Sequence, residues 1–309
     1  MTAAARMPGH TLAIVGATAS GKSDLAMAFA RESRAVEIIA VDAMQVYRGM
    51  DIGTAKPTEA DRAEVVHHGL DLVEPSASFA VAEFQQMADA ALDAIARRDG
   101  TALLVAGTGL YLAALVNELD LPGSWPEVRT RLEADAVTDL PALYGRLAGL
   151  DPDAAAKIEP TNTRRIVRAL EVCEGSGRRF SSFGPGLDAY PDTPIVQIGL
   201  RWPRERLAQR IEARVHRMME QGLFREVEQL LSGGDLSRTA RQALGYKELI
   251  EVLEGRCSLD EAVETIVVRT RQFAVRQDRW FRRDPRIRWI DIESESLEAL
   301  PVLREAVGA

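Results

Sequence analysis

Short, continuous apolar runs alternate with longer helical stretches along most of this chain. The runs cover residues 11–15, 36–41, 101–105 and 195–200. Continuous runs rich in β-branched residues are typical of strands buried on both faces of a parallel sheet. Between the second and third runs, residues 83–97 place their apolar side chains at helical spacing. This alternation predicts an α/β fold in which helices flank a parallel sheet.

The pattern changes at residue 116 and returns at residue 190. Residues 121–126 contain two prolines and a glycine, and from there to Arg179 helical spacing is broken by glycine and proline without any strand-like run. We therefore expect a core domain of residues 1–115 and 190–309, and an inserted small all-helical domain of residues 116–189. Beyond the last apolar run, the spacing predicts one long helical stretch over 204–231.

The first apolar run leads into G-x-x-x-x-G-K-S, which in turn opens a helix. Successive backbone amides and the positive end of the helix converge there on one anion, so this P-loop predicts a bound diphosphate or triphosphate and a P-loop NTPase-like core. Lys22 supplies a mobile cation, and the hydroxyl of Ser23 suits Mg²⁺. The expected diphosphate-binding residues of the loop are Gly16, Ala17, Thr18, Ala19, Ser20, Gly21, Lys22 and Ser23.

Two further polar residues follow apolar runs. Asp42 comes directly after the second run, and Thr108 lies shortly after the third. In open α/β sheets ligands bind beyond the carboxyl ends of the strands, so both are expected beside the P-loop. Asp42 is a candidate general base or a magnesium-linked carboxylate, although aspartate is also common where a turn begins. Thr108 is equally well placed as a helix N-cap.

Composition and charge exclude few classes of protein. The 309 residues are 46% hydrophobic and 27% charged, and no apolar run is long enough to span a bilayer. Met1–His10 contains one arginine and no apolar core, so we expect a short disordered lead, no secretory signal and a cytoplasmic protein without membrane contact. Cys173 and Cys257 stand apart and are expected to be reduced thiols.

Arginines are concentrated near the C-terminus of a chain whose net charge is -8. Residues 269–288 contain eight arginines against Asp278 and Asp284, which is a local surplus of six positive charges. Such a surplus is a candidate nucleic-acid footprint. The alternative is a solvated helix face whose arginines pair with neighbouring carboxylates.

Several longer motifs resemble one family. They are V-D-x-x-Q-V-Y-x-G-M-D-I-G-T-A-K-P at 41–57, H-H-G-L-D at 67–71, A-G-T-G-L-Y at 106–111, G-Y-K-E-L at 245–249 and T-R-Q-F-A-V-R-Q at 270–277. Together they identify the chain as a member of the tRNA dimethylallyltransferase family over residues 11–292. It departs from the family pattern at Val66, Ala106 and the pair Thr161 and Asn162. Ala43 and Val275 also depart, and each removes a polar or charged contact.

The resemblance implies transfer of a dimethylallyl group from dimethylallyl diphosphate to N6 of the adenosine 3′ to the anticodon, in tRNAs that read codons starting with U. Diphosphate is released. Asp42 would be the general base, and Thr108 would orient the amine or a diphosphate oxygen. The P-loop, Arg214 and Mg²⁺ near Ser23 would stabilise the leaving group.

The partners that the resemblance implies are dimethylallyl diphosphate and the anticodon stem-loop of tRNA, with the target base extruded from its stack. We expect a monomer without an obligate protein partner. The expected tRNA contacts come from the loops around the base, the helical insertion and the C-terminal helices. They are Asp42, Ala43, Met44, Gln45, Thr108, Arg129, Arg131, Arg164, Arg165, Ile166, Val167, Arg168, Arg241, Gln242, Gly245, Tyr246, Arg271, Gln272 and Arg276.

Three alternatives remain open from the sequence. A prenyltransferase acting on free adenine nucleotides would share the P-loop and Asp42, but a small nucleotide needs neither the helical insertion nor the arginine-rich helix. A P-loop small-molecule kinase would consume ATP, although no second run of four apolar residues ends in an acidic residue as the strand before Asp42 does. A non-catalytic tRNA-binding module would be indifferent to loss of Asp42.

Overall fold

The structure, a computed structural model, describes residues 11–32, 35–184 and 186–308. The expectation for Met1–His10 lies outside these residues. The chain forms two compact units, one made of Met1–Val116 with Tyr190–Ala309 and the other of Asn117–Ala189. Within the described residues, no helix is both long and apolar enough to cross a membrane.

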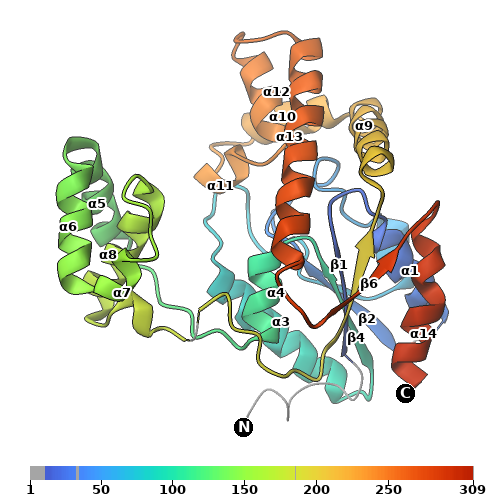
Figure 1. Cartoon of the computed structure of the whole chain (residues 1–309). Helices are drawn as coiled ribbons and strands as arrows, with labels where there is room; N and C mark the ends of the chain where they lie inside the picture. Colours follow the sequence, from blue (N-terminus) through green and yellow to red (C-terminus); the bar gives the residue numbers. More distant parts are fainter. Residues whose placement is uncertain (1–10, 33–34, 185, 309) are drawn as a thin grey trace. The chain divides into compact units, whose positions relative to one another are not determined.

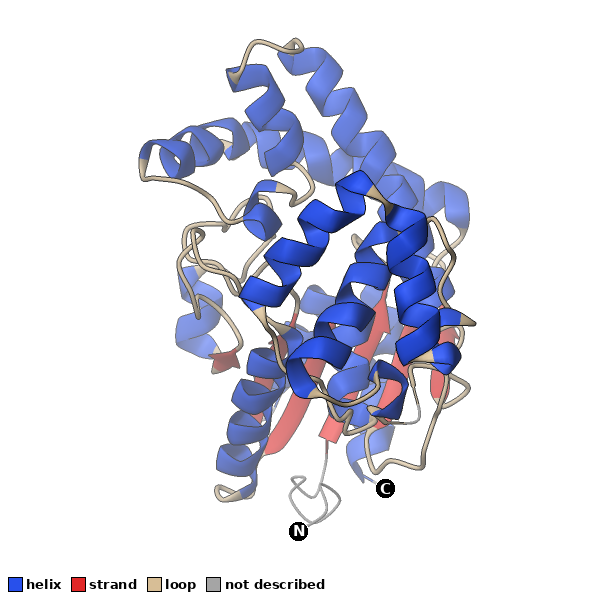
Figure 2. Cartoon of the chain, turned by 90° about the vertical axis from the view of Figure 1, so that its left-hand side faces the viewer, coloured by secondary structure: helices blue, strands red, loops and turns tan. Residues whose placement is uncertain are grey.

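The first unit is built on a six-stranded sheet in which every strand pair is parallel (Figures 1 and 2). Its strands follow the order β3-β2-β4-β1-β5-β6. Four of the strands correspond to the four apolar runs, whereas β3 and β6 were not expected from the sequence. The strands are β1 (Thr11–Gly16), β2 (Val36–Val41), β3 (His67–His68), β4 (Thr101–Ala106), β5 (Val196–Arg201) and β6 (Ile287–Asp291).

The register brings three strand ends to the same level. Ala106 at the end of β4 lies opposite Val41 of β2 on one side and opposite Val15 of β1 on the other. The residues that follow these three strands therefore begin side by side at the carboxyl edge of the sheet. In a parallel sheet this edge is where ligands bind.

Helices cover both faces of the sheet, as Figure 1 shows. On one face α3 (Val81–Ala96), α4 (Gly109–Val116) and the end of α13 (Leu259–Phe281) share an apolar core with the strands. On the other face α1 (Lys22–Glu32) and α14 (Leu300–Gly308) do the same. Burial on both faces explains why the central strands are mostly apolar, although β2 contains Glu37 and β5 contains Gln197.

A third apolar cluster of the same unit lies among α9 (Arg204–Glu220), α10 (Leu223–Ser232), α11 (Arg238–Arg241) and α12 (Tyr246–Leu253), together with the first half of α13, which begins at the capping box of Ser258. The short α2 (Glu59–Glu64) lies in the loop region before β3. The expectation of one helical stretch over 204–231 is wrong, because Gly222 takes φ = 98° and separates α9 from α10.

The second unit contains helices and no strand among its described residues. Its elements are α5 (Pro126–Thr138), α6 (Leu140–Leu150), α7 (Pro152–Ala155), α8 (Thr163–Ser176) and η2 (Phe180–Ser182). Their apolar faces form a core of their own around Leu132, Leu147 and Leu170. The side chains of Asp139, Asp151 and Asn162 cap α6, α7 and α8 respectively.

Candidate active site

The P-loop leaves β1 and enters α1 at the carboxyl edge of the sheet. Ala19 and Gly21 take φ values of 62° and 83°, so the backbone turns sharply just before the helix begins at Lys22. The first amides of a helix have no carbonyl partner within it, and those of Lys22, Ser23 and Asp24 are consequently available to an anion. Ser23 is exposed at this point.

Lys22 folds back over the loop that precedes it. Its Nζ donates hydrogen bonds to the carbonyl oxygens of Gly16 at 2.9 Å and Ala17 at 2.8 Å. Burial, and after it the nearby positive charge of Arg214, lowers the pKa of Lys22 to about 7, although Asp42 acts in the opposite direction. A negatively charged ligand would therefore raise this pKa and favour the ammonium form.

Arg214 reaches the same place from α9. Burial lowers its pKa, and the negative charges of Asp42 and Asp24 partly offset that effect. Within the described chain, no carboxylate lies at ion-pair distance from its guanidinium group. Two cations, Lys22 and Arg214, thus stand close to one helix N-terminus, where a diphosphate would compensate their charge.

Asp42 directly follows β2, and one of its two carboxylate oxygens accepts hydrogen bonds from the protein. Its Oδ1 accepts hydrogen bonds from the backbone amides of Met44 at 2.8 Å and Gln45 at 3.4 Å. Its Oδ2 has no donor among the described residues and faces Gly107, where an added Cβ would lie 3.1 Å from it. The hydrogen bonds to Oδ1 hold the carboxylate in place, and Oδ2 is available to accept a proton.

Thr108 stands next to Asp42 in the loop after β4. Its Oγ1 accepts a hydrogen bond from the amide of Ala43 at 3.1 Å, so the hydroxyl hydrogen remains available for another acceptor. The amides of Gly107 and Thr108 both donate to the carbonyl of Val41 at 3.2 Å. These bonds join the two loops, and the sequence correctly placed Asp42 and Thr108 beside the P-loop.

Residues expected to contact tRNA near Asp42 differ in their surroundings. Ala43 and Met44 are half-buried. The side-chain amide of Gln45 donates to the carbonyls of Thr54 at 3.0 Å and Ala55 at 3.2 Å, which ties the loop to itself. Gln45 therefore stabilises the loop 43–57, a role that the sequence did not indicate.

Tyr246, which was expected to contact tRNA, lies inside the protein. Tyr246 is fully buried, and its hydroxyl donates to Oε1 of Glu226 at 2.6 Å. Gly245 is buried as well, and its amide donates to the carboxylate of Glu248 at 2.9 Å. Arg241 forms an ion pair with Glu254, whereas Gln242 is exposed.

Glu226 was not singled out in the sequence, yet it organises the loop that follows Asp42. Its carboxylate accepts hydrogen bonds from three successive backbone amides, Asp51 at 3.0 Å, Ile52 at 2.7 Å and Gly53 at 3.3 Å. Gly53 also touches the ring of Tyr246, since an added Cβ would lie 2.4 Å from it. The only sequence signal is an acidic residue on the apolar side of a helix.

In the helical unit, several of the expected tRNA contacts serve its own fold. Arg129 and Arg168 both pair with the fully buried carboxylate of Glu171, at 2.7 Å and 2.9 Å. Arg131 pairs with Glu174 at 2.5 Å. These internal bonds limit how many phosphates the three arginines can reach.

Two neighbouring pairs of residues on α8 differ in their exposure to solvent. The side chains of Ile166 and Val167 lie in the core of the helical unit, so any tRNA contact through them would involve their backbone. Arg164 and Arg165 are exposed at the start of the helix. Together with Arg131, which is exposed despite its ion pair, they are the arginines of the predicted set that are exposed in this unit.

The arginine surplus near the C-terminus is smaller in the structure than in the sequence. Arg269 pairs with Glu248 at 2.5 Å, Arg282 with Asp278 at 2.7 Å and Arg286 with Asp284 at 2.6 Å. Asp278 and Asp284 were already included in the count, whereas Glu248 lies outside 269–288, so counting within that range overestimated the surplus.

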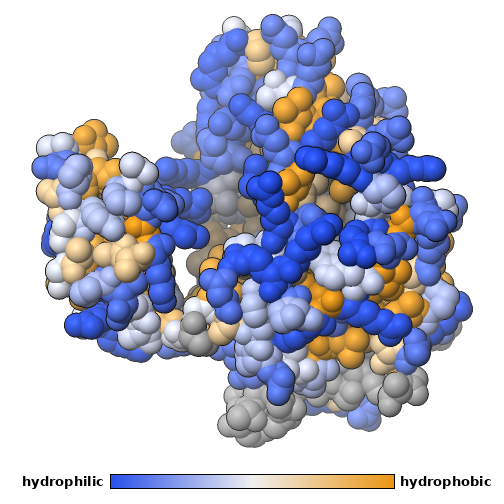
Figure 3. Space-filling view, viewed as in Figure 1, coloured by the Kyte–Doolittle hydropathy of each residue, from blue (hydrophilic) through white to orange (hydrophobic). Residues whose placement is uncertain are grey.

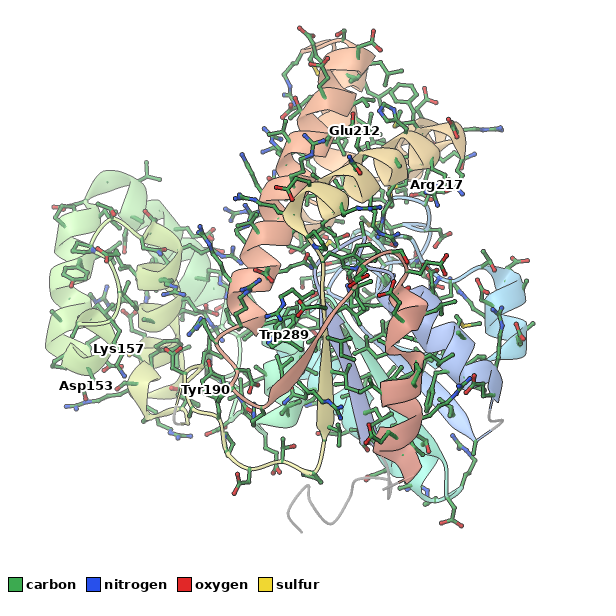
Figure 4. The ribbon with its side chains drawn as sticks, turned by 45° about the vertical axis from the view of Figure 1, so that its right-hand side comes forward. Asp153, Lys157, Tyr190, Glu212, Arg217 and Trp289 are labelled. Carbon is green, nitrogen blue, oxygen red and sulfur yellow. The ribbon has the colours of Figure 1, made fainter. Side chains whose placement is uncertain are left out.

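The predicted contacts on α13 itself lie at its surface. Arg271 pairs at 2.7 Å with Glu212, which Figure 4 labels on α9. Gln272 and Arg276 are exposed. Hydrophilic side chains cover much of the surface over α13 in Figure 3, so this helix still offers a polar face to a large ligand.

Comparison with known proteins gives consistent matches over the chain. The family model described as IPP transferase matches residues 45–284, and the model described as isopentenyl transferase matches residues 9–67. A tRNA dimethylallyltransferase of Kineococcus radiotolerans is 47% identical over 311 residues, covering 96% of this chain and 98% of its own. That of Thermobifida fusca is 48% identical over 292 residues, covering 93% and 91%.

Solved structures agree with the sequence matches. A tRNA isopentenylpyrophosphate transferase from Bacillus halodurans has a TM-score of 0.70 at 36% identity, covering 97% of this chain and 96% of its own. A eukaryotic dimethylallyltransferase acting on tRNA has a TM-score of 0.78 at 27% identity, covering 96% and 78%.

Proposed function

Since the chain belongs to the IPP transferase family, we propose that it is a tRNA dimethylallyltransferase that alkylates N6 of the adenosine 3′ to the anticodon in tRNAs reading codons that start with U. One observation supports the chemistry most directly. The P-loop, Thr108 and Asp42 follow the three adjacent parallel strands β1, β4 and β2, so the loop of Thr108 lies between the P-loop and Asp42 at the same edge of the sheet.

The geometry suits a displacement at an allylic carbon. The N6 nitrogen forms a bond to C1 of the dimethylallyl group while the bond from C1 to the diphosphate oxygen breaks. The exocyclic amine is a weak nucleophile because its lone pair is delocalised into the ring, so removal of its proton by Oδ2 of Asp42 assists the attack. The electron pair of the broken bond leaves with the diphosphate, whose charge Lys22 and Arg214 stabilise.

Mg²⁺ fits this site as a companion of the diphosphate. Across the described ranges, no group of three or more histidine, cysteine, aspartate or glutamate side chains could hold a metal ion. Mg²⁺ is commonly held by one protein oxygen, substrate phosphates and water. The exposed hydroxyl of Ser23, beside the free amides of α1, is the protein ligand we propose, and the ion would neutralise charge on the leaving diphosphate.

Transfer assays with Asp42→Asn test the proposal. Asparagine preserves the acceptor for the Met44 amide but cannot take a proton, so we expect kcat to fall by roughly 10²- to 10⁴-fold while the affinity for diphosphate stays close to that of the wild type. The assay contains Mg²⁺, labelled dimethylallyl diphosphate and an anticodon stem-loop with adenosine beside the anticodon.

Parallel reactions distinguish the other functions. AMP replaces the stem-loop in one, and ATP with either acceptor replaces dimethylallyl diphosphate in another. Equal rates with AMP and the stem-loop would exclude a tRNA-specific enzyme. Consumption of ATP in that reaction, together with no transfer from dimethylallyl diphosphate in the main assay, would indicate a kinase instead.

A further inference from the structure

Gln277 on α13 joins the two loops between which the reaction takes place. Its side chain is buried, with 7% of its surface exposed. Its Oε1 accepts a hydrogen bond from the backbone amide of Thr18 at 2.8 Å, and its Nε2 donates one to the carbonyl of Gly107 at 2.7 Å. Thr18 lies in the P-loop, and Gly107 immediately precedes Thr108.

The loop after β4 is held by the same helix at a second point. One turn beyond Gln277, the ring of Trp280 packs so closely on Gly109 that an added Cβ would lie 2.0 Å from it. An added Cβ on Gly107 would lie 3.6 Å from Nε2 of Gln277 and 3.1 Å from Oδ2 of Asp42. Helix α13 therefore fixes the loop on both sides of Thr108.

This arrangement also decides which amides of the P-loop face a ligand. Because the amide of Thr18 is bonded to Gln277, it is not available to a diphosphate. The anion can still bind to other amides of the loop and of the start of α1, to Arg214, and to Lys22, whose Nζ donates to the carbonyls of Gly16 and Ala17. Gln277 thus influences where along the loop the diphosphate binds.

We propose that Gln277 is a positioning residue that sets the separation between the dimethylallyl diphosphate site and the pair formed by Asp42 and Thr108. The inference rests on the proposed function. A displacement reaction needs its reacting atoms within about 3.5 Å of each other, and a shift of about 1 Å can cost 100-fold in rate. Only a group with both a donor and an acceptor satisfies Thr18 and Gly107 together.

Gln277→Met is the first test, because methionine keeps the volume of the side chain and removes both hydrogen bonds. We expect kcat to fall roughly 30- to 100-fold, with a KM for the stem-loop close to that of the wild type, since the residue is buried. The matched control is Gln85→Met. Gln85 donates from Nε2 to the carbonyl of Ala114 at 2.9 Å, joining α3 to α4 away from both loops, and kcat should be retained.

Gln277→Glu gives a readout that a merely structural role would not produce. A protonated glutamate accepts from Thr18 and donates to Gly107 as glutamine does, whereas a carboxylate repels the Gly107 carbonyl oxygen. Burial and that oxygen raise the pKa of the introduced group. The ratio of variant to wild-type kcat should therefore increase as the pH is lowered from about 8 to about 6.

The outcomes separate this inference from the proposed function. Transfer by the wild type with undiminished kcat in Gln277→Met would overturn the positioning role, as would an equal loss in Gln85→Met. If Gln277→Met does not fold, the pH dependence of Gln277→Glu decides. A ratio of variant to wild-type kcat that does not change with pH would then overturn the positioning role. A wild-type protein that transfers nothing would refute the function, and the inference with it.

Discussion

At the scale of single residues, the site is defined by charges that the protein leaves uncompensated. The positive charge of Arg214 adds to burial in lowering the pKa of Lys22, and burial lowers the pKa of Arg214 itself. Many other arginines pair with carboxylates, as Arg129 and Arg168 do with the single carboxylate of Glu171. The motif at residues 16–23 was sufficient to predict Lys22, whereas the pairing of the other arginines depends on carboxylates distant in sequence.

The lowered pKa of Lys22 predicts proton uptake when diphosphate binds. Above pH 7 the lysine of the free protein is mainly neutral, and the anion raises its pKa, so binding at about pH 8 should take up close to one proton at this site. Affinity should accordingly decrease as the pH rises above 7. Calorimetric titration of inorganic diphosphate in buffers of different ionisation enthalpy measures the uptake.

Lys22→Met is the control for protons that inorganic diphosphate itself gains or loses when it binds. The difference between wild type and variant should approach one proton at about pH 8 and disappear near pH 5, where Lys22 is already charged. Equal uptake by the two proteins at the higher pH would show that Lys22 stays protonated in the free protein.

Gly107→Ala should impair catalysis without unfolding the protein. The new methyl group would lie 3.1 Å from Oδ2 of Asp42. The carboxylate must therefore move by a few tenths of an ångström, or the methyl group keeps Oδ2 from the N6 proton that it is proposed to remove. We expect kcat to fall about 10-fold or more. Gly145→Ala, whose Cβ meets nothing within 4 Å, is the control and should be fully active.

At the scale of elements, the apolar pattern predicted the strands on which the site is built and missed those at the edges. Residues 36–41 match β2, because a strand covered on both faces is mostly apolar, with Glu37 as the one charged residue here. In β6, Arg288 interrupts the run, and β3 is only His67–His68, so neither carries that signal. The break at Gly222 was missed because the apolar spacing on either side is helical.

Tyr246→Phe should destabilise the protein without weakening tRNA binding. The variant loses the hydrogen bond from the buried hydroxyl to the carboxylate of Glu226, which is worth about 2 kcal/mol. Urea denaturation measures the loss in free energy of unfolding. Tyr144→Phe, which removes a half-buried bond to the carbonyl of Ala155, should cost about 1 kcal/mol.

Stem-loop affinity decides between the two roles considered for Tyr246. An unchanged free energy of unfolding together with weaker binding of the stem-loop would restore the direct contact that the sequence suggested. Unchanged binding would show that the tyrosine of the G-Y-K-E-L motif stabilises the α10–α12 region and does not contact the stem-loop.

At the scale of the whole molecule, long-range hydrogen bonds escaped the sequence entirely. Gln277 contacts Thr18 across 259 positions, and Glu226 contacts Asp51 across 175. Both side chains belong to helices in which the spacing of apolar residues indicates only that one face is buried. Their function follows from which loops the fold brings to that face, which no local pattern records.

The two ends of the helical unit lie together, which makes the unit removable. The side-chain amide of Asn117 donates to the carbonyl of Ala189 at 3.2 Å, and the unit has its own apolar core. Replacing residues 117–189 by a short Gly-Ser linker should therefore leave the sheet and the P-loop folded. We expect inorganic diphosphate to bind with the affinity of the intact chain, because Lys22 and Arg214 remain.

The same replacement should weaken binding of the anticodon stem-loop by about 10-fold or more, as the exposed Arg164 and Arg165 are lost with the unit. Substituting both arginines by alanine in the intact chain provides the matched variant, and fluorescence anisotropy of a labelled stem-loop measures both. An unchanged affinity in the two proteins would place recognition of tRNA on the α13 side of the core alone. Weaker binding only after excision would instead assign it to contacts of the unit other than these two arginines.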